Sequence, residues 1–259
     1  MTRVLSALVL LPVVIGTVWF LPPVGTLLLA LVAAVLAYAE YAAIAKALGA
    51  RVLGGSGAAV VLACVAVRGG GADTVLMSAL IVIGAVAVST GRPGPGILAD
   101  TAASLFAPVY IGLPLGAIAA VRAQPNGREA VLLLMAVIVV SDSAQYYTGR
   151  AFGRRPLAPS ISPKKTVEGA IGGLVFGTAA MAIGGRWVFG VEWWLLALAG
   201  ATIAALGIVG DLFESLLKRS AGVKDSSHLI PGHGGVLDRI DSWLFAAPVY
   251  YVFVRWLAS

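Results

Sequence analysis

The sequence predicts an all-α protein, a polytopic integral membrane helical bundle with about nine transmembrane helices. Of its 259 residues, 59% are hydrophobic and only 12% are charged, about half the charged share of a soluble domain. The mean hydropathy is +0.96, and the apolar residues fall in runs long enough to cross a bilayer. A soluble fold of this length could not bury so much apolar surface, so lipid must be the solvent for most of the chain.

Nine apolar runs are the candidate spans, most of them near the roughly 20 residues that a helix needs to cross a bilayer. They are 4–21, 24–46, 56–68, 73–89, 104–121, 129–149, 167–186, 193–217 and 243–257. The third run is short and the eighth ends in a charged stretch, so eight or ten spans also fit the pattern. The first run has no small-x-small cleavage site before Pro22, so we expect a retained span rather than a signal peptide.

The runs follow one another without a long polar segment, so we expect a single integral membrane domain, 1–259. Within it, the helices of about 1–122 would have a structural, lipid-facing role. Residues from about 123–259 would supply the catalytic helices and cytoplasmic loops, because the charged motifs lie there.

Basic residues predict the orientation. Most of the 18 Lys and Arg residues lie at the N-terminus and in the even-numbered loops, including 150–166 and 218–242. The positive-inside rule then places these loops and the N-terminus in the cytoplasm, in a multi-pass protein of the inner or plasma membrane. The net charge of +6 does not indicate nucleic acid, because the basic residues lie in short loops between spans.

The stretch 211–241 holds a concentration of charge that is unusual for this chain. Asp211, Glu214, Ser215 and Lys218 follow at i, i+3, i+4 and i+7. This spacing places them on one face of a helix, so they form a polar stripe at the cytoplasmic end of the eighth span.

Asp238 and Asp241 are again three residues apart, at the start of the ninth span. Two helix ends that each offer carboxylates can build a divalent-cation site. Hard oxygen ligands, with few soft ligands in the chain, favour Mg²⁺ over zinc. The alternative is a solvated interfacial cluster in which these acids pair with nearby bases, Lys218, Arg219 and Arg239.

The loop between these helix ends contains both histidines and four glycines. His228 and His233 make a weak zinc motif, because the chain offers no further soft ligands. We expect His233 to contact phosphate or to order the loop. Gly232, Gly234 and Gly235 would let backbone amides approach an anionic ligand closely.

A second loop, SISPKKTVEG at 160–169, places two lysines directly before a helix. The free amides and the positive dipole end of that helix, beside Lys164 and Lys165, suit a phosphate group. The alternatives are a positive-inside signal or contact with anionic lipid. The glycines that follow at intervals of four, a pattern typical of close helix packing, are Gly169, Gly173 and Gly177.

Asp142 and Glu40 lie inside predicted spans, where ionisable side chains are costly and are functional candidates by default. Asp142 lies in the second half of the sixth span, and either a site role or a structural pairing fits it. Glu40 lies near the cytoplasmic end of the second span, where an interfacial anchor is as well supported as a role in chemistry.

The motifs of the charged stretch, SLLKR at 215–219, KD at 224–225, HGG at 233–235 and DRID at 238–241, resemble the signature of the phosphatidate cytidylyltransferases, the CDP-diacylglycerol synthases. SPKKTVEG and the acid-bearing sixth span resemble a second region of that family. The resemblance implies an Mg²⁺-dependent reaction of CTP with phosphatidic acid that yields CDP-diacylglycerol and pyrophosphate. It also places Asp211, Asp238 and Asp241 around the metal, with room for a second cation.

The expected roles follow from the residue types and the resemblance. The catalytic candidates are Ser215, Lys218, Arg219, Lys224, Asp225, Asp238 and Asp241. The substrate-binding candidates are Asp142, Ser162, Lys164, Lys165, Thr166, His233, Gly234, Gly235 and Arg239. The expected partners are CTP, phosphatidic acid and the bilayer, without nucleic acid, and a homodimer is compatible with the sequence. The rival functions are a lipid or ion transporter and another CTP-using membrane enzyme, such as a polyprenol or phytol kinase.

Overall fold

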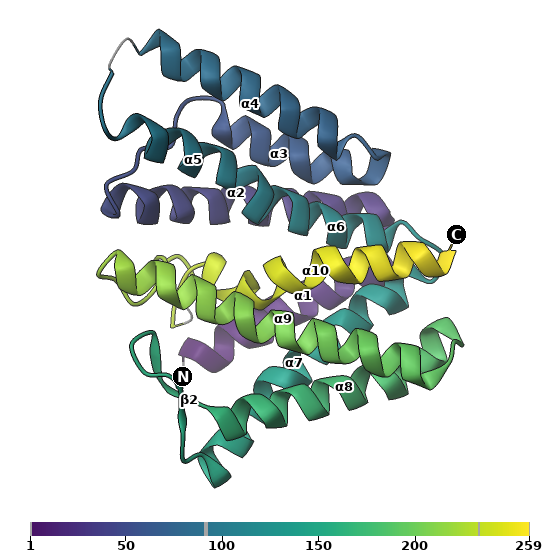
Figure 1. Cartoon of the computed structure of the whole chain (residues 1–259). Helices are drawn as coiled ribbons and strands as arrows, with labels where there is room; N and C mark the ends of the chain where they lie inside the picture. The colour runs from purple at the N-terminus through teal and green to yellow at the C-terminus, as the bar shows by residue number, and fades with distance from the viewer. Residues whose placement is uncertain (1, 91–92, 233, 259) are drawn as a thin grey trace. The chain divides into compact units, whose positions relative to one another are not determined.

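The computed structural model describes residues 2–90, 93–232 and 234–258, and most of them are helical (Figure 1). The helices are α1 Thr2–Phe20, α2 Pro23–Ala47, α3 Ser56–Ala66, η1 Val67–Gly69, α4 Ala72–Ser89, α5 Ile97–Ala107, η2 Pro108–Gly112, α6 Leu113–Arg122, α7 Gly127–Phe152, α8 Val167–Phe189, α9 Trp193–Ser220 and α10 Leu237–Ala258. Each of the nine predicted runs corresponds to a helix, with α5, η2 and α6 forming one continuous segment. The predicted helical fold class is confirmed.

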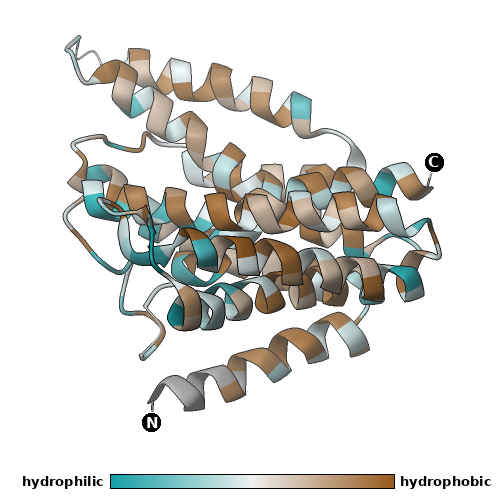
Figure 2. Ribbon diagram, turned by 60° about the horizontal axis from the view of Figure 1, so that its bottom comes forward, coloured by the Kyte–Doolittle hydropathy of each residue, from teal (hydrophilic) through white to brown (hydrophobic). Residues whose placement is uncertain are grey.

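Six helices of the described chain are long and apolar enough to cross a membrane. They are α2, α4, the segment Ile97–Arg122, α7, α8 and α9. Shorter apolar helices are Leu10–Phe20 and Ser56–Gly69. Figure 2 shows hydrophobic residues along most of the helix lengths and hydrophilic residues mainly near helix ends and in loops. The chain is therefore a multi-pass membrane protein.

The chain divides into two compact units. Unit 1 combines the N-terminal helices, up to Ala120, with Leu217–Ile240. Unit 2 combines Val121–Leu216 with the chain from Asp241 onward. We call Leu217–Ile240 the signature segment, since it carries most of the motifs described above. This segment belongs to the same unit as α2, which is far from it in the sequence.

In unit 1, α3 packs closely against the segment of η2 and α6. A Cβ atom at Gly112 or at Gly116 would lie 2.5 Å from the carbonyl oxygens of Val60 and Cys64 respectively. Only glycine allows backbones to approach so closely. The buried Tyr41 of α2 donates a hydrogen bond to the carbonyl of Ala103 at 2.8 Å, which links α2 to α5.

In unit 2, α7 and α8 pack along their lengths. Gly169, Gly173 and Gly177 are buried. A Cβ atom at Gly173 would overlap Gln145 of α7, and one at Gly177 would lie 2.9 Å from Ala204 of α9. The packing role predicted from the spacing of these glycines is confirmed.

A short antiparallel hairpin precedes α8, where the sequence predicted a loop. Its strands are β1 Pro156–Ala158 and β2 Ser162–Thr166. The carboxylate of Glu168 accepts hydrogen bonds from the amides of Arg154 and Arg155 at 3.0 and 3.2 Å, so the chain folds back on itself. Helix α8 then begins with Thr166 as its N-cap, whose hydroxyl accepts from the Gly169 amide at 3.1 Å.

Candidate active site

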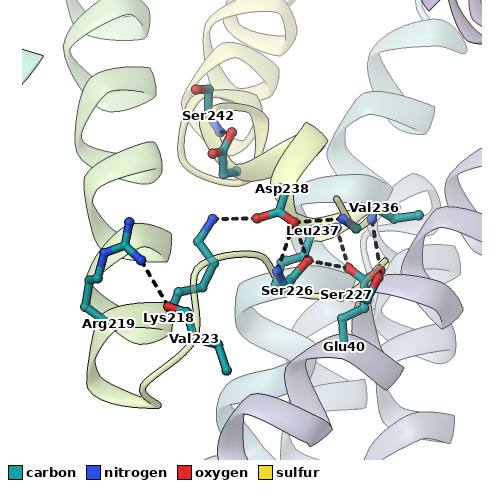
Figure 3. Close-up of polar contacts among 12 residues, drawn as sticks. Glu40, Lys218, Arg219, Val223, Ser226, Ser227, Val236, Leu237, Asp238 and Ser242 are labelled. Atoms are coloured by element: carbon teal, nitrogen blue, oxygen red, sulfur yellow. Dashed lines mark hydrogen bonds and ion pairs between the residues drawn. The ribbon is translucent and has the colours of Figure 1, made fainter. Parts of the chain in front are cut away.

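Asp238, in the first turn of α10, is the centre of the polar contacts in the signature segment. Its Oδ1 accepts a hydrogen bond from the ammonium of Lys218 at 2.5 Å. Its Oδ2 accepts from the Ser226 amide at 2.9 Å, the Ser226 hydroxyl at 2.8 Å and the Gly235 amide at 2.7 Å. Figure 3 shows Lys218 reaching Asp238 from one side and Ser226 from the other. Both carboxylate oxygens are therefore engaged by donors.

These donors decide the charge of Asp238. Burial by itself would raise its pKa, but hydrogen bonds from Lys218 and from the Gly235 and Ser226 amides outweigh burial and lower the pKa to about 2. Asp238 is therefore ionised at neutral pH, and it faces an equally buried ammonium. Such a buried pair is costly to break, because either partner alone would be an uncompensated charge.

Glu40 of α2 lies beside this cluster and is also buried. Its Oε1 accepts hydrogen bonds from the Ser227 hydroxyl at 2.6 Å and the Val236 amide at 2.9 Å. Its Oε2 accepts from the Leu237 amide at 2.7 Å and the Ser226 hydroxyl at 3.0 Å. Glu40 is therefore not an exposed interfacial anchor. An acid within an apolar run was the sequence signal, but its partners could not be read from the sequence, and neither serine was singled out.

The adjacent glycines make room for these carboxylates. Gly234 has a φ of +79°, and a Cβ atom there would lie 2.5 Å from Asp238 Oδ2. A Cβ atom at Gly235 would overlap the Ser226 hydroxyl and lie 2.5 Å from each carboxylate oxygen of Glu40. The two glycines were expected to let amides approach an anionic ligand. In the structure, the anion that the Gly235 amide meets is the protein's own Asp238.

Other charged residues of the signature segment are exposed. Arg219 donates a hydrogen bond from Nη1 to the carbonyl of Val223 at 3.1 Å, just beyond the end of α9. His233 lies outside the described residues. The remaining exposed candidates in this segment are Lys224, Asp225 and Arg239.

In unit 2, the hairpin reaches α9 through an ion pair between Lys165 Nζ and Asp211 Oδ2. The two side chains are 22% and 29% exposed, so the pair is accessible to solutes. The structure thus brings together a residue of the loop 150–166 and a residue of the charged stretch 211–241. The neighbouring candidates differ in their exposure to solvent: Lys164 is exposed and Ser162 is half-buried. The hydroxyl of Thr166 is already used as the acceptor for the Gly169 amide.

Helices α9 and α10 approach closely next to Asp211. A Cβ atom at Gly210 would lie 2.5 Å from the carbonyl oxygen of Asp241. The rings of Phe213 and Phe245 lie 5.5 Å apart between centroids. Within unit 2, the helix positions that carry Asp211 and Asp241 therefore lie near each other, and Asp241 is half-buried.

The polar stripe of α9 is only partly accessible. Glu214 and Lys218 are buried, whereas Asp211 and Ser215 are half-buried. Asp142 is exposed on α7, and it accepts a hydrogen bond from the Gln145 side-chain amide at 3.2 Å.

The carboxylates suit Mg²⁺ in type, because Mg²⁺ prefers hard oxygen ligands. Among the described residues, no group of three or more His, Cys, Asp or Glu side chains is gathered to hold a metal ion. Mg²⁺ is usually held by one or two carboxylates together with the phosphates of a substrate, rather than by a cage made only of protein. The residues therefore fit a cation that binds together with a nucleotide. Of the Asp238 oxygens, Oδ2 has three donors and Oδ1 has one, the Lys218 ammonium, so Oδ1 keeps more capacity to bind a further cation.

The model of the cytidylyltransferase family matches residues 1–257. Three curated relatives are similar over shorter regions. An uncharacterised protein of Escherichia coli K12, YnbB, is 45% identical over 131 residues, which are 51% of this chain and 44% of that protein. A phosphatidate cytidylyltransferase of Mycobacterium bovis is 38% identical over 163 residues, 62% of this chain and 53% of the relative. One from Synechocystis is 46% identical over 132 residues, 50% and 44% respectively. The matched regions span about half the length of these relatives.

Proposed function

Because the chain belongs to the cytidylyltransferase family, we propose that it transfers the cytidylyl group of CTP to phosphatidic acid, forming CDP-diacylglycerol and pyrophosphate. The observation that carries the proposal is the polar centre of the signature segment, in which Lys218 and Asp238 pair at 2.5 Å beside exposed basic residues. The names of two relatives support the same reaction.

The chemistry asks for charge stabilisation more than for proton transfer. A phosphate oxygen of phosphatidic acid attacks the α-phosphorus of CTP and forms a new P–O bond. The bond from the α-phosphorus to the oxygen that bridges the α- and β-phosphates breaks, and that oxygen leaves with pyrophosphate. Since the attacking oxygen is already anionic near neutral pH, no catalytic base is required. Most of the rate enhancement therefore comes from positioning the two polyanions and stabilising their charge.

The basic residues would bind the phosphate groups. Lys218 is the firmest candidate, because the buried Asp238 holds its ammonium in place. The other candidates for the phosphates of CTP or lipid are Lys164, Lys165, Arg219, Lys224 and Arg239. Ser215, Asp142 and Asp225 would complete the polar surroundings.

Carboxylates among the predicted metal ligands, Asp211, Asp238 and Asp241, would hold Mg²⁺ together with the phosphates of the nucleotide. When bound, the cation would neutralise part of the triphosphate charge and favour departure of the pyrophosphate. The lysines paired with Asp211 and Asp238 would keep these carboxylates ionised and oriented.

The distribution of basic residues supports an orientation with the N-terminus and both motif-bearing loops in the cytoplasm, where CTP is found. The chain would then act as one integral membrane domain of the inner or plasma membrane. Residues from about 123 onward would supply most of the site, and the N-terminal helices would be its scaffold.

The test uses the purified full-length chain in detergent with Mg²⁺, labelled CTP and phosphatidic acid. We expect a lipid-extractable cytidine nucleotide and one pyrophosphate for each molecule of product. Two control reactions contain either no lipid or diacylglycerol in place of phosphatidic acid. A CTP-dependent lipid kinase would release CDP and phosphorylate an alcohol, and a transporter would leave CTP intact. Absence of pyrophosphate release by the wild-type protein would refute the proposal.

A further inference from the structure

Glu40 belongs to none of the motifs of the charged stretch, yet among the described residues its side chain makes hydrogen bonds only to the signature segment. It lies in α2, an apolar helix long enough to span a membrane, and it is only 5% exposed. A carboxyl group in such surroundings is costly unless donors satisfy it fully. Its burial therefore calls for a role that offsets this cost.

The four partners of Glu40 are all donors, the set that a carboxylate satisfies best. Two of them are the amides of Val236 and Leu237, where α10 begins. The first amides of a helix have no partner within the helix, and an acidic group there is favourable. Glu40 thus caps α10 from a different helix, 196 and 197 residues away in the sequence.

The other contacts connect Glu40 to Asp238. The Ser226 hydroxyl oxygen lies 3.0 Å from Glu40 Oε2 and 2.8 Å from Asp238 Oδ2 (Figure 3). With its single proton it donates to one carboxyl group at a time, and it thereby connects the two. Gly235 donates its amide to Asp238, and a side chain at this position would overlap Ser226 and crowd Glu40. A single hydrogen-bonded cluster therefore runs from Glu40 through Ser226 to Asp238 and Lys218.

We infer that Glu40 is a positioning residue of the active site. It fixes the start of α10, and through Ser226 it fixes the orientation of the Asp238 carboxylate and so the position of the Lys218 ammonium bound to Oδ1. The inference rests on the proposed function, because it assigns the effect of Glu40 to cytidylyl transfer. The N-terminal helices then contribute directly to the geometry of the site.

The main test compares Glu40→Gln with Glu192→Gln, a matched control whose side chain is exposed outside the cluster. Gln keeps the size of Glu but turns an NH₂ group toward one pair of donors. We expect Glu40→Gln to lower kcat at least tenfold per folded molecule, well below the unfolding temperature, with less than a threefold change in the KM for CTP. Glu40→Asp, which keeps the carboxylate, should recover part of kcat. A role in stability alone would lower the unfolding midpoint and leave kcat per folded molecule unchanged, which would overturn the inference.

Ser226→Ala tests the route and remains usable if Glu40→Gln does not fold, because it keeps Glu40 and its contacts with the α10 amides. Its kcat should fall at least fivefold. Where both single variants fold, the double variant should be no worse than the weaker of the two, since both act on Asp238 by one path. Full activity of Ser226→Ala, or multiplied losses in the double variant, would overturn the inference.

Hydrogen exchange tests this inference without relying on enzymatic activity, and so independently of the proposed function. If the wild-type protein releases no pyrophosphate, the proposed function has failed, and exchange at the α10 start then decides the inference alone. Glu40→Gln should exchange the amides of Val236 and Leu237 at least tenfold faster than Glu192→Gln does. Equal exchange in the two variants would overturn the inference.

Discussion

The pair of Lys218 and Asp238 offers the sharpest prediction, because both side chains are buried and each is the other's charge partner. Their side chains are 10% and 5% exposed, and the ammonium lies 2.5 Å from Oδ1. Lys218→Met would leave Asp238 charged without its cation. Asp238→Asn would remove the carboxylate that the ammonium meets at 2.5 Å and would put an NH₂ group among donors.

The expected size of the effect follows from the burial of the pair. Removal of one partner of a buried ion pair costs about 3–5 kcal/mol. For a chain of this size, 1 kcal/mol corresponds to roughly 2–4 °C in the unfolding midpoint, so each single variant should lose about 6–20 °C. The double variant, Lys218→Met with Asp238→Asn, removes both charges of this pair and should lose less than the sum of the two.

Thermal unfolding in detergent measures the midpoints, and the CTP assay measures turnover. Lys224→Met is the control, because Lys224 is exposed and its replacement should change stability by less than about 0.5 kcal/mol. Asp238→Asn should abolish turnover with Mg²⁺ present, while the protein still inserts and purifies. If the single variants unfold like Lys224→Met, or if Asp238→Asn keeps substantial activity, the reasoning about this pair is wrong.

Three further predictions follow from the other contacts. Lys165→Met should lower kcat/KM at least tenfold with little loss of stability, because the pair with Asp211 is partly exposed; unchanged kinetics would remove both residues from the site. Gly235→Ala should lower the unfolding midpoint far more than Gly222→Ala does. At position 222 a Cβ atom would meet nothing within 4 Å, and only the φ of +73° would be strained. Similar midpoints for the two variants would contradict the packing described for position 235. The pKa of Asp238 is lowered from its ordinary value of 3.8 to about 2, so its ionised form contributes about 2 kcal/mol above pH 4. That contribution should be lost as the pH falls from 4 to 2, and midpoints of wild-type protein and Asp238→Asn should converge over this window.

Local patterns in the sequence were enough to predict the helices. Each apolar run became a helix because a chain in lipid must satisfy its own backbone groups, and a helix does so within one segment. The spacing of Gly169, Gly173 and Gly177 predicted close packing for the same local reason. The hairpin before α8 was not predicted, since it depends on Glu168 accepting amides that lie 13 and 14 residues away.

Within the candidate site, the sequence by itself determined which residue types are concentrated at the ends of α9 and α10, because helical periodicity places i, i+3 and i+4 on one face. Only the tertiary structure decided which of them meet. The pairing of Lys218 with Asp238 depends on how the chain turns between the two helices, and that of Lys165 with Asp211 on the fold of the hairpin. The contact of Glu40 with the start of α10 joins segments almost 200 residues apart. Hydrophobicity is a property of each residue and its near neighbours, whereas a shared hydrogen bond depends on where distant backbones come to lie.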